Sequence, residues 1–110
     1  MDAYHYIANE LARRRRCNEE YEHIHCRLDD WDFFISYTGG YAEFRSHEGT
    51  EHEGWWPYIT PEDVVKQMGK DVKDVTVDDY YDLSFDFIGG KTIRQVLMER
   101  DEEDVWFDPE

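Results

Sequence analysis

The sequence predicts an α+β fold, in which an N-terminal helix and two short helices pack on one face of a small antiparallel β-sheet. Two patterns predict this class. Apolar residues recur at helical spacing near the N-terminus, after residue 60 and after residue 92, whereas they alternate with polar residues over 20–46 and 78–88. The chain has 110 residues, of which 40% are hydrophobic, so we expect a single domain over residues 1–110 with a core of its own.

The first predicted element is a helix over residues 1–17. Asp2 is placed to cap its first turn, and Ile7 and Leu11 fall on one apolar stripe. Four arginines at residues 13–16 end it, where positive charge stabilises the negative end of the helix dipole. We interpret this run as a solvated helix end rather than a nucleic-acid arm, because the chain as a whole is strongly acidic.

A meander of three antiparallel strands is expected over residues 20–46. Asp29 and Asp30 provide turn chemistry after the first strand, and residues 31–38 are rich in the aromatic and β-branched side chains that favour a second. Gly39 and Gly40 are expected to supply the positive φ angles of a tight hairpin turn. Residues 41–46 then return as the third strand.

The later elements are a short helix over residues 60–69, a strand over 78–88, a helix over 92–100 and an acidic tail over 101–110. In the 60–69 helix, the apolar residues Val64, Val65 and Met68 are expected to face inward. In the 78–88 strand, the predicted buried face consists of Tyr81, Leu83, Phe85 and Phe87, and the opposite face of Asp78, Tyr80, Asp82, Ser84 and Asp86.

Charge is the strongest functional signal in the sequence. The chain carries 27 Asp and Glu against 12 Lys and Arg, a formal net charge of −15. Residues 1–27 contain five acidic and five basic residues, so the whole excess falls in residues 28–110. Because concentrated like charge destabilises a compact fold, we expect a partner with a strongly positive surface.

A row of carboxylates is expected on the 78–88 strand. Alternate residues on one face of a strand recur about every 6.6 Å, so Asp78, Asp82 and Asp86 would form a rigid line of negative charge. The other acidic candidates are Asp29, Asp30 and Asp32 in a turn, Glu48, Glu51 and Glu53 in a loop, and Asp101, Glu102, Glu103 and Asp104 in the tail. Such an array resembles the phosphates of a DNA duplex, which basic residues of DNA-binding proteins neutralise.

Aromatic anchors are needed as well, because charge alone gives loose binding. The candidates are Trp55 and Trp56, flanked by acidic residues, and Trp106 with Phe107 in the tail. The chain has no apolar signal segment and only two cysteines, Cys17 and Cys26, which predicts reduced thiols in a cytoplasmic protein.

In size, charge and acid-rich sheet face, the chain resembles phage-encoded inhibitors of bacterial defence, the anti-CRISPR and anti-restriction proteins, several of which mimic DNA. The resemblance implies a non-enzymatic inhibitor, without cofactor, that occupies the DNA- or PAM-binding cleft of a CRISPR effector complex or restriction nuclease. We expect the partner to be this basic protein, with no direct contact to nucleic acid or membrane.

Three alternatives fit the same sequence, and one of them is a halophile enzyme or housekeeping domain that is acidic for solubility. An immunity protein that neutralises a basic nuclease toxin would also be small, acidic and cytoplasmic. A small metal-binding enzyme would use His23 and His25, because residues two apart on a strand point the same way, with Cys26 on the opposite face.

Overall fold

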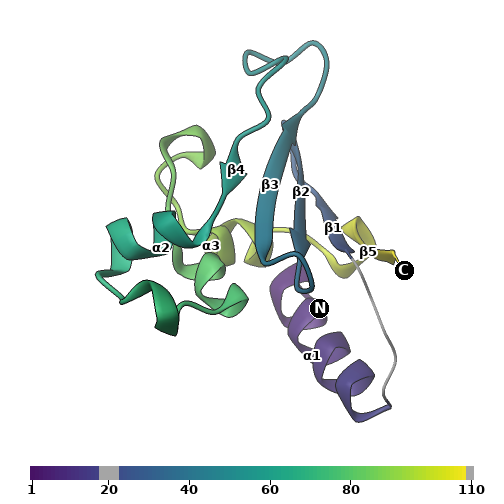
Figure 1. Cartoon of the computed structure of the whole chain (residues 1–110). Helices are drawn as coiled ribbons and strands as arrows, with labels where there is room; N and C mark the ends of the chain where they lie inside the picture. Colours follow the sequence, from purple (N-terminus) through teal and green to yellow (C-terminus); the bar gives the residue numbers. More distant parts are fainter. Residues whose placement is uncertain (18–22, 109–110) are drawn as a thin grey trace.

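A five-stranded antiparallel sheet forms the centre of the protein (Figure 1). The computed structural model describes residues 1–17 and 23–108. The strands are β1 (His23–Arg27), β2 (Trp31–Ser36), β3 (Tyr41–Ser46), β4 (Tyr58–Ile59) and β5 (Val105–Asp108). Their order across the sheet is β4-β3-β2-β1-β5, so the last strand lies beside the first.

The α-helices are α1 (Ala3–Arg16), α2 (Pro61–Met68) and α3 (Ile93–Met98). The described residues also form four short 3₁₀ helices. Three lie between α2 and α3, namely η1 (Val72–Asp74), η2 (Val77–Asp82) and η3 (Asp86–Ile88), and η4 (Glu102–Asp104) lies between α3 and β5. Figure 1 shows the three α-helices below and to the left of the sheet, and the loop between β3 and β4 projecting from its upper end. The predicted α+β class is therefore confirmed.

Alternation along the strands divides the sheet into two faces. One face carries Ile24, Phe33 and Phe44, which pack in a single core with Ile7 of α1 and Leu97 of α3. The strand register aligns these residues, because Phe33 lies opposite Phe44 and Ile24 opposite Ile35. The helices thus cover one face of the sheet, and the side chains of the other face form a second surface.

Most helix predictions hold in detail. Asp2 caps α1, and its carboxylate accepts the His5 backbone N–H at 3.0 Å. The acidic side chain of Asp63 accepts the Thr60 N–H at 2.9 Å at the start of α2, and Thr92 forms a capping box with Gln95 at the start of α3. The last turn of α1 is basic as expected, with Arg13 paired to Glu10 at 2.9 Å.

The inward face predicted for α2 is only partly correct. Val64 is fully buried, but Val65 and Met68 are exposed. The helix has eight residues and lies at the margin of the molecule, so one side chain alone reaches the core.

The meander is confirmed, with two adjustments. The second strand ends at Ser36, two residues earlier than expected, while the third covers residues 41–46 as predicted. Residues 20–22 of the predicted first strand lie outside the described residues. Of the two turn glycines, Gly40 has a positive φ, 72°, and Gly39 does not. Gly39 is required for space, because a Cβ there would lie 2.8 Å from Ser36 Oγ and from the Tyr41 ring.

The predicted strand over residues 78–88 is wrong. Residues 77–82 form η2 and residues 86–88 form η3, with only a single bridge between Ser84 and Thr92. The cause is a local cap: the Asp79 carboxylate accepts the Thr76 backbone N–H at 2.8 Å and the Lys70 ammonium at 2.9 Å. That cap starts a helical turn and buries Tyr80 and Tyr81 together, where a strand would place them on opposite faces.

The tail over residues 101–110 is more ordered than predicted. Residues 102–104 form η4, and residues 105–108 form β5 against β1. Val105 and Phe107 pack against the core, and their inward direction places Trp106 and Asp108 on the opposite face of the sheet. Residues 109 and 110 lie outside the described part of the chain.

Candidate functional site

The face of the sheet opposite the helices carries a row of side chains that crosses all five strands. Tyr58, Glu43, Phe34, His25 and Trp106 are successive partners in the ladders of β4, β3, β2, β1 and β5. We call this surface the open face, and it further includes His23, Tyr41, Arg45 and Asp108. Its outer residues are exposed: Tyr58 retains 63% of its surface and Trp106 40%.

A buried carboxylate lies in the middle of the open face. Glu43 is 1% exposed, and its Oε1 accepts hydrogen bonds from Arg45 Nε at 2.8 Å and pairs with Arg45 Nη2 at 2.7 Å. The Arg45 guanidinium also lies over the rings of Phe34, at 4.9 Å, and Trp56, at 5.8 Å. A hydrogen bond to the Glu43 carboxylate raises the pKa of the Tyr58 hydroxyl. One buried charge therefore orients an arginine and a tyrosine on this surface.

Two histidines and an aspartate meet at the β1–β5 side of the open face. His25 Nε2 and Asp108 Oδ2 are 2.6 Å apart, and ligand atoms of His23, His25 and Asp108 all lie within 4.8 Å of one another. The His25 ring stacks on Trp106 with centroids 4.8 Å apart. Burial lowers the pKa of His25, against the opposing effect of the Asp108 carboxylate. Among the described residues, this is the cluster of three metal-ligating side chains that the fold brings together.

The predicted direction of the histidines is confirmed. His23 and His25 lie on the same face of β1, and Cys26 is buried on the other face. Both cysteines are free thiols, and burial raises the pKa of Cys26 to about 12. This thiol has the environment of a core residue and not of a metal ligand or nucleophile.

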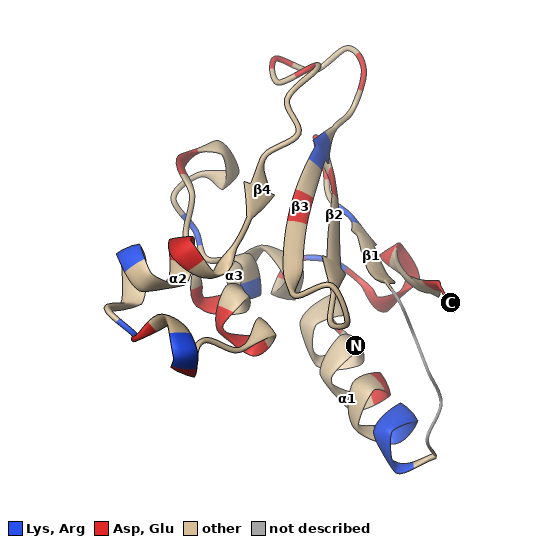
Figure 2. Ribbon diagram, viewed as in Figure 1, with Lys and Arg blue, Asp and Glu red and all other residues tan. Residues whose placement is uncertain are grey.

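Six of the predicted acidic residues gather at one end of the sheet. These residues, which we call the acidic end, are Asp29, Asp30, Asp32, Glu48, Glu51 and Glu53. The turn before β2 is joined to the loop after β3, because the His47 backbone N–H donates to the Asp30 carbonyl at 2.9 Å. The His47 ring contacts Asp32 at 3.0 Å. Figure 2 shows the acidic positions of the projecting loop in red.

The tryptophans of that loop are exposed. Trp55 retains 57% of its surface and Trp56 63%, so neither belongs to the core. The base of the loop is fixed by aromatic contacts, since the His52 ring stacks on buried Trp31 at 4.9 Å and lies 5.5 Å from Trp55. The other predicted anchor pair is divided by β5: Trp106 faces outward, whereas Phe107 packs inward beneath the Arg14 guanidinium at 4.4 Å.

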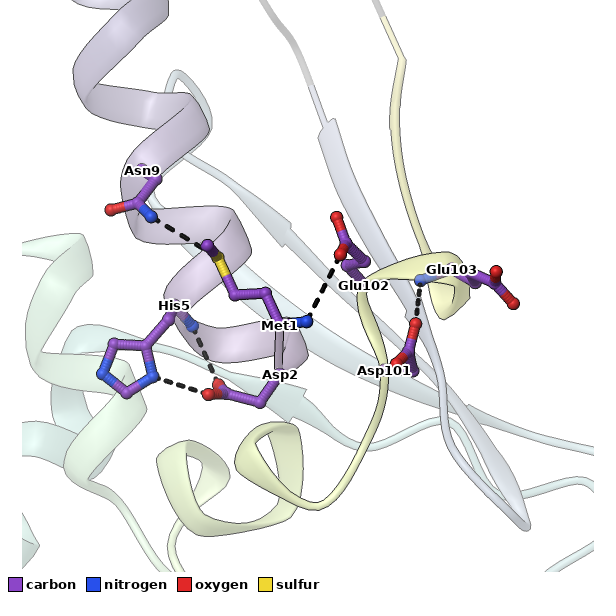
Figure 3. A network of polar contacts seen from close by, with 7 residues as sticks. All are labelled: Met1, Asp2, His5, Asn9, Asp101, Glu102 and Glu103. Carbon is purple, nitrogen blue, oxygen red and sulfur yellow. Dashed lines mark hydrogen bonds and ion pairs between the residues drawn. The ribbon is translucent and has the colours of Figure 1, made fainter.

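The acidic residues of the tail have structural contacts. Asp101 accepts the Glu103 backbone N–H at 3.0 Å, and Glu102 pairs with the Met1 amino group at 3.3 Å (Figure 3). Arg100 pairs with two carboxylates: its Nη2 lies 3.2 Å from Asp104 Oδ2, and its Nη1 lies 2.6 Å from Asp29 Oδ1. Arg100 therefore connects η4 to the acidic end, while the bridge between Asp2 and Asp101 and the Met1–Glu102 pair hold η4 against the start of the chain.

The predicted row of Asp78, Asp82 and Asp86 does not exist. Asp78 and Asp82 lie in η2, and Asp86 begins η3, so the spacing of a strand does not apply. Asp82 pairs with Arg94 at 2.9 Å, and Asp78 accepts the Tyr37 hydroxyl at 3.0 Å. Asp82 thus pairs with α3 and Asp78 with the turn after β2, so these carboxylates do not form a regular copy of a phosphate backbone.

Several residues of the open face were missed by the sequence reasoning. Tyr41, Glu43 and Arg45 alternate along the correctly predicted third strand, so their shared face was available from the sequence. Asp108 was not, because the tail carried no strand prediction and its neighbour β1 is distant in sequence.

Comparison with family models, with curated proteins and with solved structures gave no match. Within residues 1–17 and 23–108, no helix has the length and apolar character needed to cross a membrane.

Proposed function

We propose that the chain is a non-catalytic binding protein that occupies a basic surface of a partner protein, of the kind that binds DNA. One observation carries this proposal: the acidic end and the exposed Trp55 and Trp56 belong to the same projecting region of the fold. Carboxylates steer the encounter with a positive surface, and large aromatic side chains supply the contact energy that charge alone does not.

The acidic end is preformed in the free protein. His47 ties the loop to the turn through the Asp30 carbonyl, and Arg100 holds Asp29 toward η4. A surface that is ordered before binding loses less conformational entropy on association. Of the acidic groups predicted from the sequence, the proposed contact keeps those of the acidic end and leaves out the row at Asp78, Asp82 and Asp86, which the fold does not form.

The target to test first follows from the resemblance to anti-CRISPR and anti-restriction proteins. By this resemblance the chain would act in the cytoplasm of a bacterial host. It would be a stoichiometric inhibitor at the DNA-binding cleft of a CRISPR effector or restriction nuclease. An immunity protein for a nuclease toxin would use the same charge complementarity, and the binding experiment separates the two by DNA competition.

The experiment is a pull-down from bacterial lysate at low and high salt, with and without duplex DNA, followed by identification of the bound proteins. We expect capture of a DNA-binding nuclease that is released by salt and by DNA, because both act on the same charge pairing. Capture of one toxin-like nuclease without DNA competition would assign the immunity role instead.

Matched variants locate the contact. The triple variant Glu48→Gln, Glu51→Gln, Glu53→Gln removes three charges from the acidic end, and Glu62→Gln, Asp71→Asn, Asp74→Asn removes three from the exposed surface of α2 and η1. We expect the first to weaken binding at least tenfold and to flatten its salt dependence, and the second to leave affinity nearly unchanged. Equal effects of both triples would refute a local contact and leave only a net-charge effect. A Trp56→Ala variant that binds normally would remove the aromatic anchor from the proposal.

A further inference from the structure

We propose that His23, His25 and Asp108 bind one divalent transition-metal ion, with Zn²⁺ as the best-fitting ion, on the open face of the sheet. This proposal is independent of the function proposed above, because it concerns the β1–β5 side of the sheet and not the acidic end. It rests on strand register, on distances and on the chemistry of the three side chains.

Strand register holds the three residues together. His23 and His25 are two apart on β1 and share a face, and Asp108 is the direct partner of His23 in the antiparallel β1–β5 ladder. Backbone hydrogen bonding between the strands fixes these Cα positions, so only side-chain rotations remain free. An ion bound here would bridge the first and last strands of the sheet.

The distances are close to those of a bound site. The ligand atoms of the three residues lie within 4.8 Å of one another, and His25 Nε2 already contacts Asp108 Oδ2 at 2.6 Å. Tetrahedral Zn²⁺ with bonds of about 2.1 Å places its ligand atoms about 3.4 Å apart. Shifts of about 1 Å would therefore form the site, and the exposed Asp108 side chain is free to make them by rotation about its own bonds.

The surroundings orient the imidazoles. The Phe34 ring lies 4.7 Å from the His23 ring and 4.9 Å from the His25 ring, and Trp106 stacks on His25 from the other side at an interplanar angle of 6°. An apolar shell of this kind limits solvent access and strengthens the interaction of an ion with its ligands. The net charge of −15 favours any cation near the protein.

The donor set selects the class of ion. Two imidazoles with one carboxylate suit Zn²⁺ and neighbouring transition metals, whereas Mg²⁺ and Ca²⁺ prefer oxygen ligands throughout. Three protein ligands leave at least one coordination position for water or for a group from a partner.

The test is calorimetric titration of the untagged, metal-free full chain with Zn²⁺, repeated with Mg²⁺. We expect one Zn²⁺ per chain and no comparable binding of Mg²⁺. His23→Ala, His25→Ala and Asp108→Asn should each weaken Zn²⁺ binding by more than the roughly 10–100-fold that an outer-shell change costs. A second readout is the NMR signal of the imidazole nitrogens, where Zn²⁺ should shift those of His23 and His25 together.

The control is a second histidine–aspartate pair of nearly the same geometry. His5 Nδ1 contacts Asp2 Oδ2 at 2.7 Å on α1, with no second imidazole in the described part of that helix. His5→Ala should leave Zn²⁺ affinity unchanged. Asp108→Asn alters an exposed side chain and keeps its shape, so it stays informative where His25→Ala unfolds the sheet. Zn²⁺ binding that persists in both His23→Ala and Asp108→Asn, or that is lost equally in His5→Ala, would overturn the proposal, as would the absence of stoichiometric binding to the intact chain.

Discussion

Removing Arg45 should destabilise the protein through the carboxylate that it leaves behind. Glu43 is 1% exposed in the native protein, and in Arg45→Ala it loses its two guanidinium contacts, at 2.7 Å and 2.8 Å. Breaking a buried ion pair from one side costs about 3–5 kcal/mol. Because the Arg45 side chain is 53% exposed, water can enter its place, and we expect a smaller cost of about 2 kcal/mol. Tyr58 keeps its hydrogen bond to Glu43, so the carboxylate retains one partner.

That free energy converts into a measurable melting shift. A chain of 110 residues unfolds with an entropy of about 230 cal/mol/K, so about 2 kcal/mol lowers Tm by about 9 °C. Far-UV circular dichroism with thermal and urea unfolding gives the shift and the free energy of unfolding. The double variant Glu43→Gln, Arg45→Ala should be no less stable than Arg45→Ala alone, because the unpaired buried charge is gone.

A double-mutant cycle measures the coupling energy between Glu43 and Arg45, and the same cycle on an exposed ion pair provides the matched control. Lys91 and Glu99 approach to 2.6 Å, but both side chains are about half exposed, and their coupling energy should not exceed about 0.5 kcal/mol. The coupling between Glu43 and Arg45 should be about 1–2 kcal/mol. If the Glu43–Arg45 cycle is additive, or its coupling is no larger than that of Lys91–Glu99, the reasoning about the buried carboxylate is wrong.

Three further predictions test other parts of the fold. In the native protein Cys17 should react with a thiol reagent while Cys26 does not, since Cys26 is buried with its pKa raised to about 12; reaction of both thiols without unfolding would contradict this. Hydrogen bonds from the Thr76 backbone and from Lys70 lower the pKa of Asp79 below its ordinary value of 3.8. The ionised carboxylate therefore stabilises the fold above pH 3.8. This contribution is lost as the pH falls through the lowered pKa. Asp79→Asn should therefore cost about 1–3 kcal/mol at pH 7 and progressively less below about pH 3.8, measured by urea unfolding at each pH; a cost independent of pH would exclude the charge. Gly39→Ala should lower Tm more than Gly40→Ala, because the first meets Ser36 Oγ at 2.8 Å and the second only the strain of a positive φ.

The sequence predicted elements whose signals are local. Caps at Asp2, Thr60 and Thr92 and the period of two over residues 41–46 each depend on neighbours within a few positions, and each is found in the structure. These signals were sufficient for the fold class and for the shared face of His23 and His25.

The failures have two physical origins, competition between local patterns and pairing between distant segments. Residues 78–88 alternate like a strand, yet the Asp79 cap with Thr76 and Lys70 stabilises a helical turn instead. The tail was predicted without a strand because β5 depends on pairing with β1, a contact between residues 83 apart, such as His25 and Asp108. Consequently the acidic row was misplaced, while the open face and Asp108 were not assigned.

The position of β1 has a consequence for the order of folding. It pairs with β2 through a short turn, whereas its other neighbour, β5, comes from the end of the described chain. Closing a long loop costs more entropy than closing a hairpin, so we expect the meander to form first and β5 to dock afterwards. Until then the outer hydrogen-bonding edge of β1 is exposed, and β1 is a template on which other chains can pair. Docking of residues 105–108 is therefore the step that protects the protein from association through this edge.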